Sequence, residues 1–244
     1  MSIDRRIWQV TYPIFLGLLA QNIINVTDTA FLGRVGEVAL GASGMGGLYY
    51  ICVFTIAFGF STGAQILIAR RNGERNYRQI GPLMIQGVLF LFALAALFVL
   101  FSKCFAGDIM HLLISSDEIW QATMEFLDYR VWGFLFICVN VMFRALFIGI
   151  TRTKVLTLQA LIMACTNVVL DYLLIFGHGG FPKLGIQGAA IASVIAEGVS
   201  TLFFLAYTRW GVDYAKYGLN RFGRFDLATL RSVLSISIFT MLQY

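Results

Sequence analysis

The feature that most constrains this chain is a run from residue 38 to residue 69 that contains no charged side chain. A helix needs about 20 mostly apolar residues to cross the ~30 Å hydrocarbon core of a bilayer, and this run is long enough to cross with a tilt. Only 13% of the residues are charged, whereas soluble domains carry about 25%. The sequence therefore predicts a polytopic membrane protein and excludes soluble, disordered and collagen-like classes.

Apolar runs of spanning length recur along the chain. Six such runs lie between clusters of charged residues, at residues 7–32, 38–69, 79–102, about 120–150, 155–176 and 184–208. A seventh run begins near Leu230 and is too short to span by Tyr244. We therefore expect an all-α fold in three parts of a larger protein: a six-helix amino-terminal lobe at 1–208, a connection at 209–229, and the start of a seventh helix at 230–244.

Lys and Arg residues orient these runs. If the chain starts inside, thirteen basic residues fall on the inner segments and three, Arg34, Lys103 and Lys183, on the outer ones. Under the positive-inside rule this predicts a cytoplasmic amino terminus in a plasma membrane, the inner membrane of a bacterium. The net charge of +5 is then explained by the attraction of the basic inner segments to anionic lipid headgroups. No nucleic-acid partner is expected.

Signatures of enzymes and cofactors are not found in the sequence. The four cysteines show neither a disulfide framework nor zinc-ligand spacing. A phosphate-binding glycine loop, a zinc-binding HExxH helix and a nucleophile elbow are also missing. We therefore expect no enzyme and no cofactor, and any pumping would draw its energy from an ion gradient.

Polar side chains inside the first run share one helical face. Asp28 is its one charged residue, and Asn25 and Gln21 lie about one and two turns before it, which places all three on one side of a helix. Because a charge at bilayer depth is costly, we expect this face to border a cavity or a partner helix. The alternative is that Asp28 lies near the outer headgroups and is solvated there.

Two further runs carry polar pairs with a spacing of one turn. Asn167 and Asp171 stack on one face, and Ser193 and Glu197 do the same in the next run. Carboxylate, amide and hydroxyl oxygens are ligands that hard cations such as Na+ prefer, and closely placed acids also favour binding of a proton. The alternative for Asn167 is a structural hydrogen bond between helices.

Three other residues leave their roles open. Glu197 could pair with a basic group outside this chain, join the acidic residues, or face the cytoplasmic end. Arg144 lies near the inner end of its run, where we expect its side chain to snorkel to the headgroups. Pro13 removes a backbone hydrogen bond inside the first run and predicts either a hinge or a static kink.

At these residues the chain resembles a known family, the MATE (multidrug and toxic compound extrusion) transporters. The similarity covers the whole chain, and Pro13 matches the proline that bends the family's first helix. The matching segments, in chain order, are VTDTAFLGR at 26–34, GITRTK at 149–154, NVVLD at 167–171 and GIQGAAIAS at 185–193.

The resemblance implies twelve helices in two six-helix lobes that export cationic or amphipathic compounds in exchange for Na+ or H+. A carboxyl-terminal lobe of the same full-length chain would complete the cavity, and the substrates would be small organic molecules. In the DinF-like branch, the coupling site resembles Asp28, Asn167 and Asp171, with Thr where Ser193 stands. The Asn-x-x-x-Asp spacing favours that branch.

Two other functions fit a polytopic helical protein. A lipid-linked saccharide flippase would carry several basic residues in its cavity. In this chain, Arg144 is the one basic residue placed well inside a helix. A non-transporting membrane assembly subunit would show no ion-dependent flux. The sequence favours the antiporter, with Asp28, Asn167, Asp171 and Ser193 as its cation or proton site, Pro13 as a hinge, and Gln21, Asn25 and Glu197 as further residues of the cavity.

Overall fold

The computed structural model of this protein describes residues 3–219 and 227–241, and within these residues the regular structure is helical. The helices are α1 (Ile3–Val35), α2 (Glu37–Gly73), the 3-10 turn η1 (Tyr77–Gln79), α3 (Ile80–Leu113), α4 (Asp117–Arg130), α5 (Gly133–Gly149), α6 (Lys154–Phe176), α7 (Ile186–Gly211), α8 (Tyr214–Tyr217) and α9 (Leu227–Met241).

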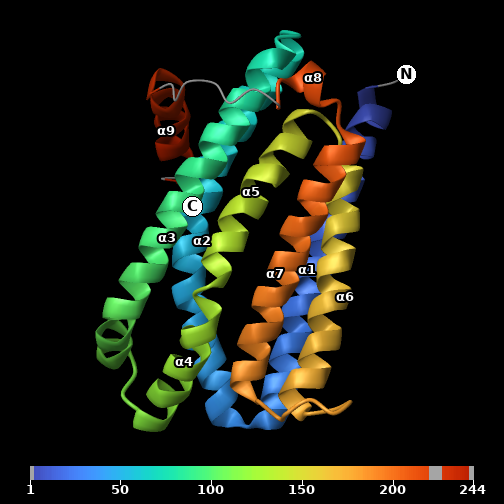
Figure 1. Ribbon diagram of the computed structural model, residues 1–244. Coiled ribbons are helices and arrows are strands. Elements are labelled where there is room, and N and C mark those ends of the chain that lie inside the picture. Colours follow the sequence, from blue (N-terminus) through green and yellow to red (C-terminus); the bar gives the residue numbers. More distant parts are fainter. Residues whose placement is uncertain (1–2, 220–226, 242–244) are drawn as a thin grey trace.

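The long helices run up and down beside one another as a bundle (Figure 1). Among the described residues, five of them are long and apolar enough to cross a membrane, and the bent pair α4–α5 meets the same criterion when its two helices are counted as one span. The loops before α3 and α6 and the short α8 gather at the end of the bundle where α1 begins. The predicted all-α fold with six apolar runs is therefore confirmed for the described residues.

The fourth predicted run differs from the expected continuous helix over 120–150. It begins earlier, at Asp117, where the Ser116 side chain accepts a hydrogen bond from the backbone N–H of Ile119 and caps the helix. It then breaks between Arg130 and Gly133, and the two halves meet at a bend of 54°. Such a break at membrane depth is tolerated where protein surrounds it, and Val131 is buried at this point.

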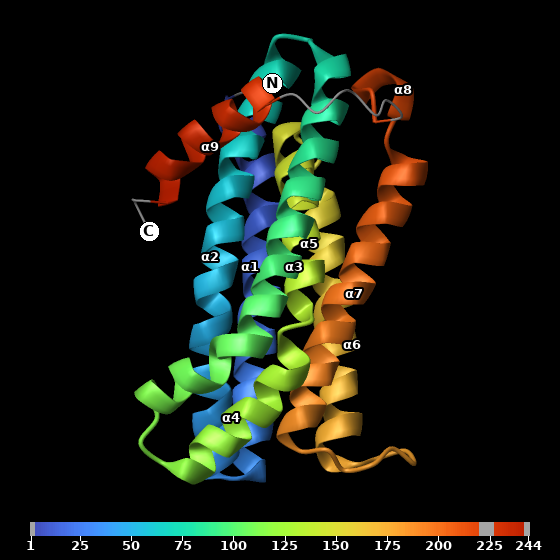
Figure 2. The same cartoon turned by 60° about the vertical axis from the view of Figure 1, so that its left-hand side comes forward.

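The helices form two groups that meet along α7. One group is made by α1, α6 and α7, with α6 packed against both of the others, and the second by α2, α3 and α5. Helices α4 and α5 pack on α7 and join the groups (Figure 2). Fully buried phenylalanines lie in this core: Phe60, Phe134, Phe147 and Phe204.

The connection after α7 and the last helix differ in detail from the predicted boundaries. Helix α7 ends at Gly211 rather than 208, and α9 begins at Leu227 rather than 230. Helix α9 packs closely on α2, where a Cβ added to Gly63 would meet the Ser237 side chain and come within 2.8 Å of the Val233 carbonyl oxygen. Ser237 donates to the carbonyl of Phe60 at 3.2 Å. The division into lobes stays a prediction.

Candidate functional site

Three of the predicted site residues meet where α1 packs on α6. Asp28 comes from α1, and Asn167 and Asp171 come from α6, one turn apart. Asn167 and Asp171 are buried and Asp28 is half-buried. One terminal amide atom of Asn167 lies 3.0 Å from Asp28 Oδ1 and 3.2 Å from Asp171 Oδ2. The expectation that these three polar groups face one another inside the bundle agrees with this geometry.

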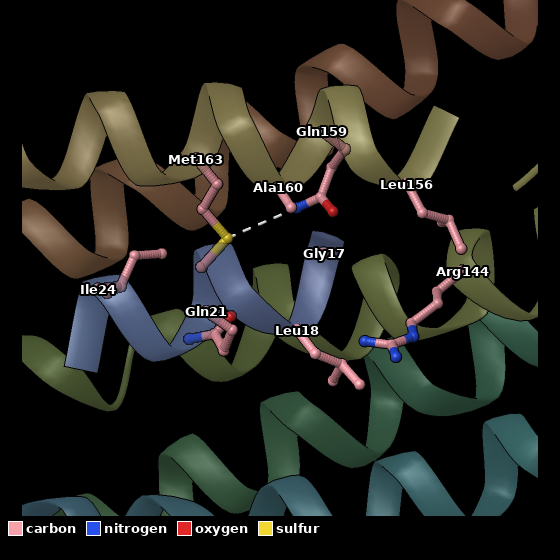
Figure 3. Close-up of a pocket in the computed structure, with 9 residues that line it drawn as sticks. All are labelled: Gly17, Leu18, Gln21, Ile24, Arg144, Leu156, Gln159, Ala160 and Met163. Atoms are coloured by element: carbon pink, nitrogen blue, oxygen red, sulfur yellow. Dashed lines mark hydrogen bonds between the residues drawn. The ribbon is translucent and has the colours of Figure 1, made fainter. Parts of the chain in front are cut away.

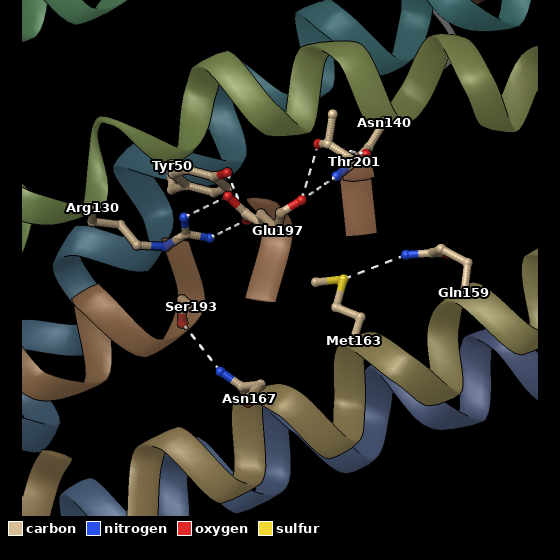
Figure 4. Close-up of polar contacts among 9 residues, drawn as sticks. All are labelled: Tyr50, Arg130, Asn140, Gln159, Met163, Asn167, Ser193, Glu197 and Thr201. Atoms are coloured by element: carbon tan, nitrogen blue, oxygen red, sulfur yellow. Dashed lines mark hydrogen bonds and ion pairs between the residues drawn. The ribbon is translucent and has the colours of Figure 1, made fainter. Parts of the chain in front are cut away.

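The amide of Asn167 fits this place in two orientations. With its nitrogen toward the acids, it donates a hydrogen bond to each carboxylate. With its oxygen there, three oxygen atoms converge and the nitrogen instead points to Ser193 Oγ at 3.5 Å (Figure 4). Three converging oxygens repel one another unless a proton or a cation lies between them. The orientation with the nitrogen toward the acids satisfies the hydrogen-bonding needs of both ends of the amide.

We call Asp28, Asn167 and Asp171 the carboxyl cluster. Its carboxylate oxygens do not all have a hydrogen-bond partner among the described residues. Asp28 Oδ1 and Asp171 Oδ2 lie 3.0 and 3.2 Å from the same terminal amide atom of Asn167, so the two carboxyl groups are close neighbours. Asp171 Oδ1 has no hydrogen-bond partner in the described part of the chain. A buried carboxylate oxygen without a partner is costly, so the site favours the binding of a positive charge.

The other two residues of the predicted α1 face separate in the structure. Gln21 lines a cavity between α1, α5 and α6 (Figure 3). Asn25 is exposed, and its backbone carbonyl accepts a hydrogen bond from Thr29 at 2.7 Å. Gln21 therefore agrees with the expected cavity, and Asn25 lies outside both the cavity and the carboxyl cluster.

For Glu197, the sequence leaves open a basic partner outside this chain, a place among the acidic residues, or a position facing the cytoplasmic end. The structure corrects this, because the partner of Glu197 is a basic residue of this chain. Glu197 is buried and forms an ion pair with Arg130 of α4. The guanidinium donates two hydrogen bonds, from Nη2 to Oε1 at 2.8 Å and from Nη1 to Oε2 at 3.1 Å. Tyr50 of α2 donates to Oε1 at 2.8 Å and its ring lies 3.5 Å below the guanidinium carbon.

We call Tyr50, Arg130 and Glu197 the arginine brace. Asn140 of α5 extends it by donating to the Glu197 carbonyl at 3.1 Å and accepting from Thr201 at 2.9 Å (Figure 4). The sequence analysis missed it, although a signal existed, since Arg130 is the one Lys or Arg residue between Lys103 and Arg144. A buried acid needs a basic partner, and that requirement points to Arg130.

The break between α4 and α5 makes room for the brace. A Cβ added to Gly133 would meet Arg130 Nη1 and Glu197 Oε2 and would lie 3.2 Å from the Tyr50 hydroxyl. Gly133 therefore supports the brace, because its missing side chain leaves room for the ion pair. Pro13 lies within α1, and its side chain lies outside the described residues, so its role as a hinge stays a prediction.

Comparison with known proteins places this geometry in a family. The MatE family model matches residues 13–173. A probable multidrug resistance protein NorM of Agrobacterium fabrum is 29% identical over 229 residues, with 93% of this chain and 49% of that protein covered. A probable NorM of Synechocystis is 27% identical, with 88% and 46% covered.

A solved structure has the same fold. It is the outward-facing conformation of a multidrug resistance MATE family transporter of the MOP superfamily, with a TM-score of 0.88 at 20% identity, covering 99% of this chain and 53% of that one. The chain thus spans about half the length of the curated relatives that it matches. These relatives bear the name NorM, so assignment to the DinF-like branch stays a prediction. Together with the six apolar spans, the match shows that this chain belongs to the MatE family, a family of transporters and not of enzymes.

Proposed function

We propose that this chain is the amino-terminal lobe of a cation-coupled antiporter, in which Asp28, Asn167 and Asp171 bind the coupling Na+ or H+. The observation that carries the proposal is the convergence of two acids and an amide at 3.0 and 3.2 Å inside the bundle. Ser193 contributes a hydroxyl at the edge of this set. A carboxyl-terminal lobe would supply the other wall of the transport cavity.

The exported compounds in this proposal are cationic or amphipathic organic molecules, by analogy with relatives that are named for multidrug resistance. Binding of the coupling ion neutralises the two acids and favours one arrangement of α1 over the other, with Pro13 as the hinge. Release of the ion on the opposite side reverses the change. The flippase alternative has less support, because the described cavity has one basic lining residue, Arg144.

The orientation in this proposal follows the basic residues. Arg70, Arg71, Arg152 and Arg209 lie at or next to the helix ends that meet at one end of the bundle. We place that end and the amino terminus in the cytoplasm, and the protein in a bacterial inner membrane. Labelling of single cysteines from outside spheroplasts tests this, and labelling at position 152 without permeabilisation would contradict it.

The function is tested by flux through the full-length transporter in proteoliposomes, with ethidium as the permanently cationic probe. Asp28→Asn keeps the shape of the side chain and removes its charge, so ethidium-dependent ion flux should fall to the protein-free background. The matched control is Asp108→Asn, since Asp108 is an exposed acid on α3 and its loss should leave flux unchanged. Normal flux in the Asp28→Asn variant would remove the cluster from the coupling mechanism.

The choice of ion is tested with the same vesicles. A Na+ gradient at equal pH and a pH gradient without Na+ are imposed separately. Ethidium export under one gradient alone identifies the coupling ion, and export under neither would contradict the antiport proposal.

A further inference from the structure

Helix α5 carries an arginine, Arg144, that has no acidic partner among the residues that the structure describes. Its half-buried side chain lines a cavity of about 70 Å³ between α1, α5 and α6 (Figure 3). Across the described ranges, 3–219 and 227–241, no acidic side chain pairs with it, and its closest recorded aromatic contact is the Phe58 ring at 5.9 Å. Arg130, on the preceding helix, has Glu197 as a partner.

An unpaired cation is unusual inside a membrane span. Charged side chains there pair with one another or with backbone carbonyls, or they line a pathway for ions or substrates. Arg144 borders the cavity beside Leu18 and Gln21, and its expected snorkelling to the headgroups stays a prediction. Its guanidinium carries five N–H donors, and the side chain forms part of the cavity wall.

The rest of the cavity wall suits an amphipathic guest. Gln21 adds an amide for which the described residues provide no hydrogen-bond partner. Gln159 is held in place because it donates to Ser200 Oγ at 2.7 Å. Leu18, Leu156 and Met163 provide apolar surface. A planar guanidinium binds carboxylate and phosphate oxygens in pairs, so an anionic group next to an apolar body fits this wall.

We propose that Arg144 is an anion subsite that binds the carboxylate or phosphate group of an amphipathic substrate. The volume of about 70 Å³ is well below the ~300–1,000 Å³ of pockets that hold drug-sized ligands. The subsite thus holds the end group of a substrate and not the whole molecule. It is distinct from the carboxyl cluster, because Gln21 and Asp28 are two helical turns, roughly 10 Å, apart along α1. The inference rests on the proposed function, which makes the guest a transport substrate.

The experiment measures binding to the full-length transporter in phosphatidylcholine nanodiscs, without any ion gradient. The probes are a cationic rhodamine dye with a free carboxylate and its methyl ester, which differ in the anionic group alone. The wild type should bind the acid about tenfold more tightly than the ester, and Arg144→Gln should abolish this preference. Arg144→Lys should keep part of it, because it retains charge and loses the paired geometry. Arg209→Gln, at an exposed arginine on α7, is the matched control.

A second arm separates the two sources of the anion. Nanodiscs with phosphatidylglycerol add a lipid phosphate that competes for Arg144 if the subsite accepts headgroups. The affinity for the acid dye would then fall more in the wild type than in Arg144→Gln, which identifies a lipid guest. If the affinity for the acid dye falls equally in the wild type and in Arg144→Gln, the guest of the subsite is a soluble amphipathic molecule.

Two outcomes would overturn the proposal. They are equal affinity of the wild type for acid and ester, and an acid preference that survives in Arg144→Gln. Neither result depends on an ion gradient. The binding assay therefore tests the anion subsite alone, and the Asp28→Asn flux assay tests the coupling site.

Discussion

Two clusters of buried charge lie in the same bundle. On α7, Ser193 borders the carboxyl cluster and Glu197, one turn further along, belongs to the arginine brace. In the arginine brace, each Glu197 carboxylate oxygen accepts a hydrogen bond from Arg130, and Tyr50 donates to one of them. In the carboxyl cluster, two acids share one amide, and Asp171 Oδ1 has no hydrogen-bond partner among the described residues. The brace is neutral and satisfied, whereas in the proposed function the cluster takes a positive charge from a bound cation or proton.

This difference separates structural from functional charges. A satisfied ion pair at a helix break resists rearrangement, because opening it exposes two charges to a low-dielectric interior. Two acids with one shared donor have no such closed pairing, and in the proposed function they change partners as a cation enters or leaves. We therefore expect substitutions in the brace to reduce stability and substitutions in the cluster to reduce transport.

The largest stability effect is expected from Glu197→Ala. It leaves the Arg130 guanidinium buried without its partner, which costs ~3–5 kcal/mol for a buried pair. Thermal unfolding of the full-length transporter in detergent measures the loss. A double variant, Arg130→Met with Glu197→Leu, should recover much of it because neither charge remains buried. A single variant as stable as the wild type would show that the brace does not stabilise the fold.

A smaller loss is expected from Gly133→Ala. The added Cβ would meet both Arg130 and Glu197, so the pair must shift, at a cost of ~1–3 kcal/mol for an overpacked site. Gly44→Ala in α2 is the matched control, since an added Cβ there has nothing within 4 Å, and alanine favours helix over glycine. Unfolding in detergent should thus separate the two alanine variants, and equal midpoints would mean that the break accommodates a methyl group.

The residues of the carboxyl cluster could be predicted because local spacing carries the information. Asn167 and Asp171 are one turn apart, so any helix through them stacks their side chains. Asp28 is the one charge in its run, which already demands a polar neighbour. Asn25 was misplaced because a rotation of about 100° per residue puts it roughly 60° away from Asp28 around α1. That angle carries Asn25 from the contact with α6 to an exposed position.

The arginine brace could not be read from local spacing. Arg130 and Glu197 are far apart in sequence, and their meeting depends on a bend of 54° within a run that reads as continuous apolar helix. Gly133 indicates a weak point in that run, but it does not say that the space left by its missing side chain holds a guanidinium. Arg144 shows the same limit, because its cavity forms between three helices and not along one.

The smallest stability effect, of opposite sign, is expected from Asp171→Asn. The amide has nearly the shape of the carboxyl group, and the substitution removes one of two adjacent buried acids. The free energy of unfolding should therefore be unchanged or higher by ~1 kcal/mol. Coupled ethidium flux in proteoliposomes should nevertheless disappear, because a cation then faces one carboxylate instead of two. Loss of function at undiminished stability is typical of sites where function maintains an unfavourable arrangement. A large loss of stability in Asp171→Asn would instead assign the cluster a structural role like that of the arginine brace, and the contrast between the two regions would fail.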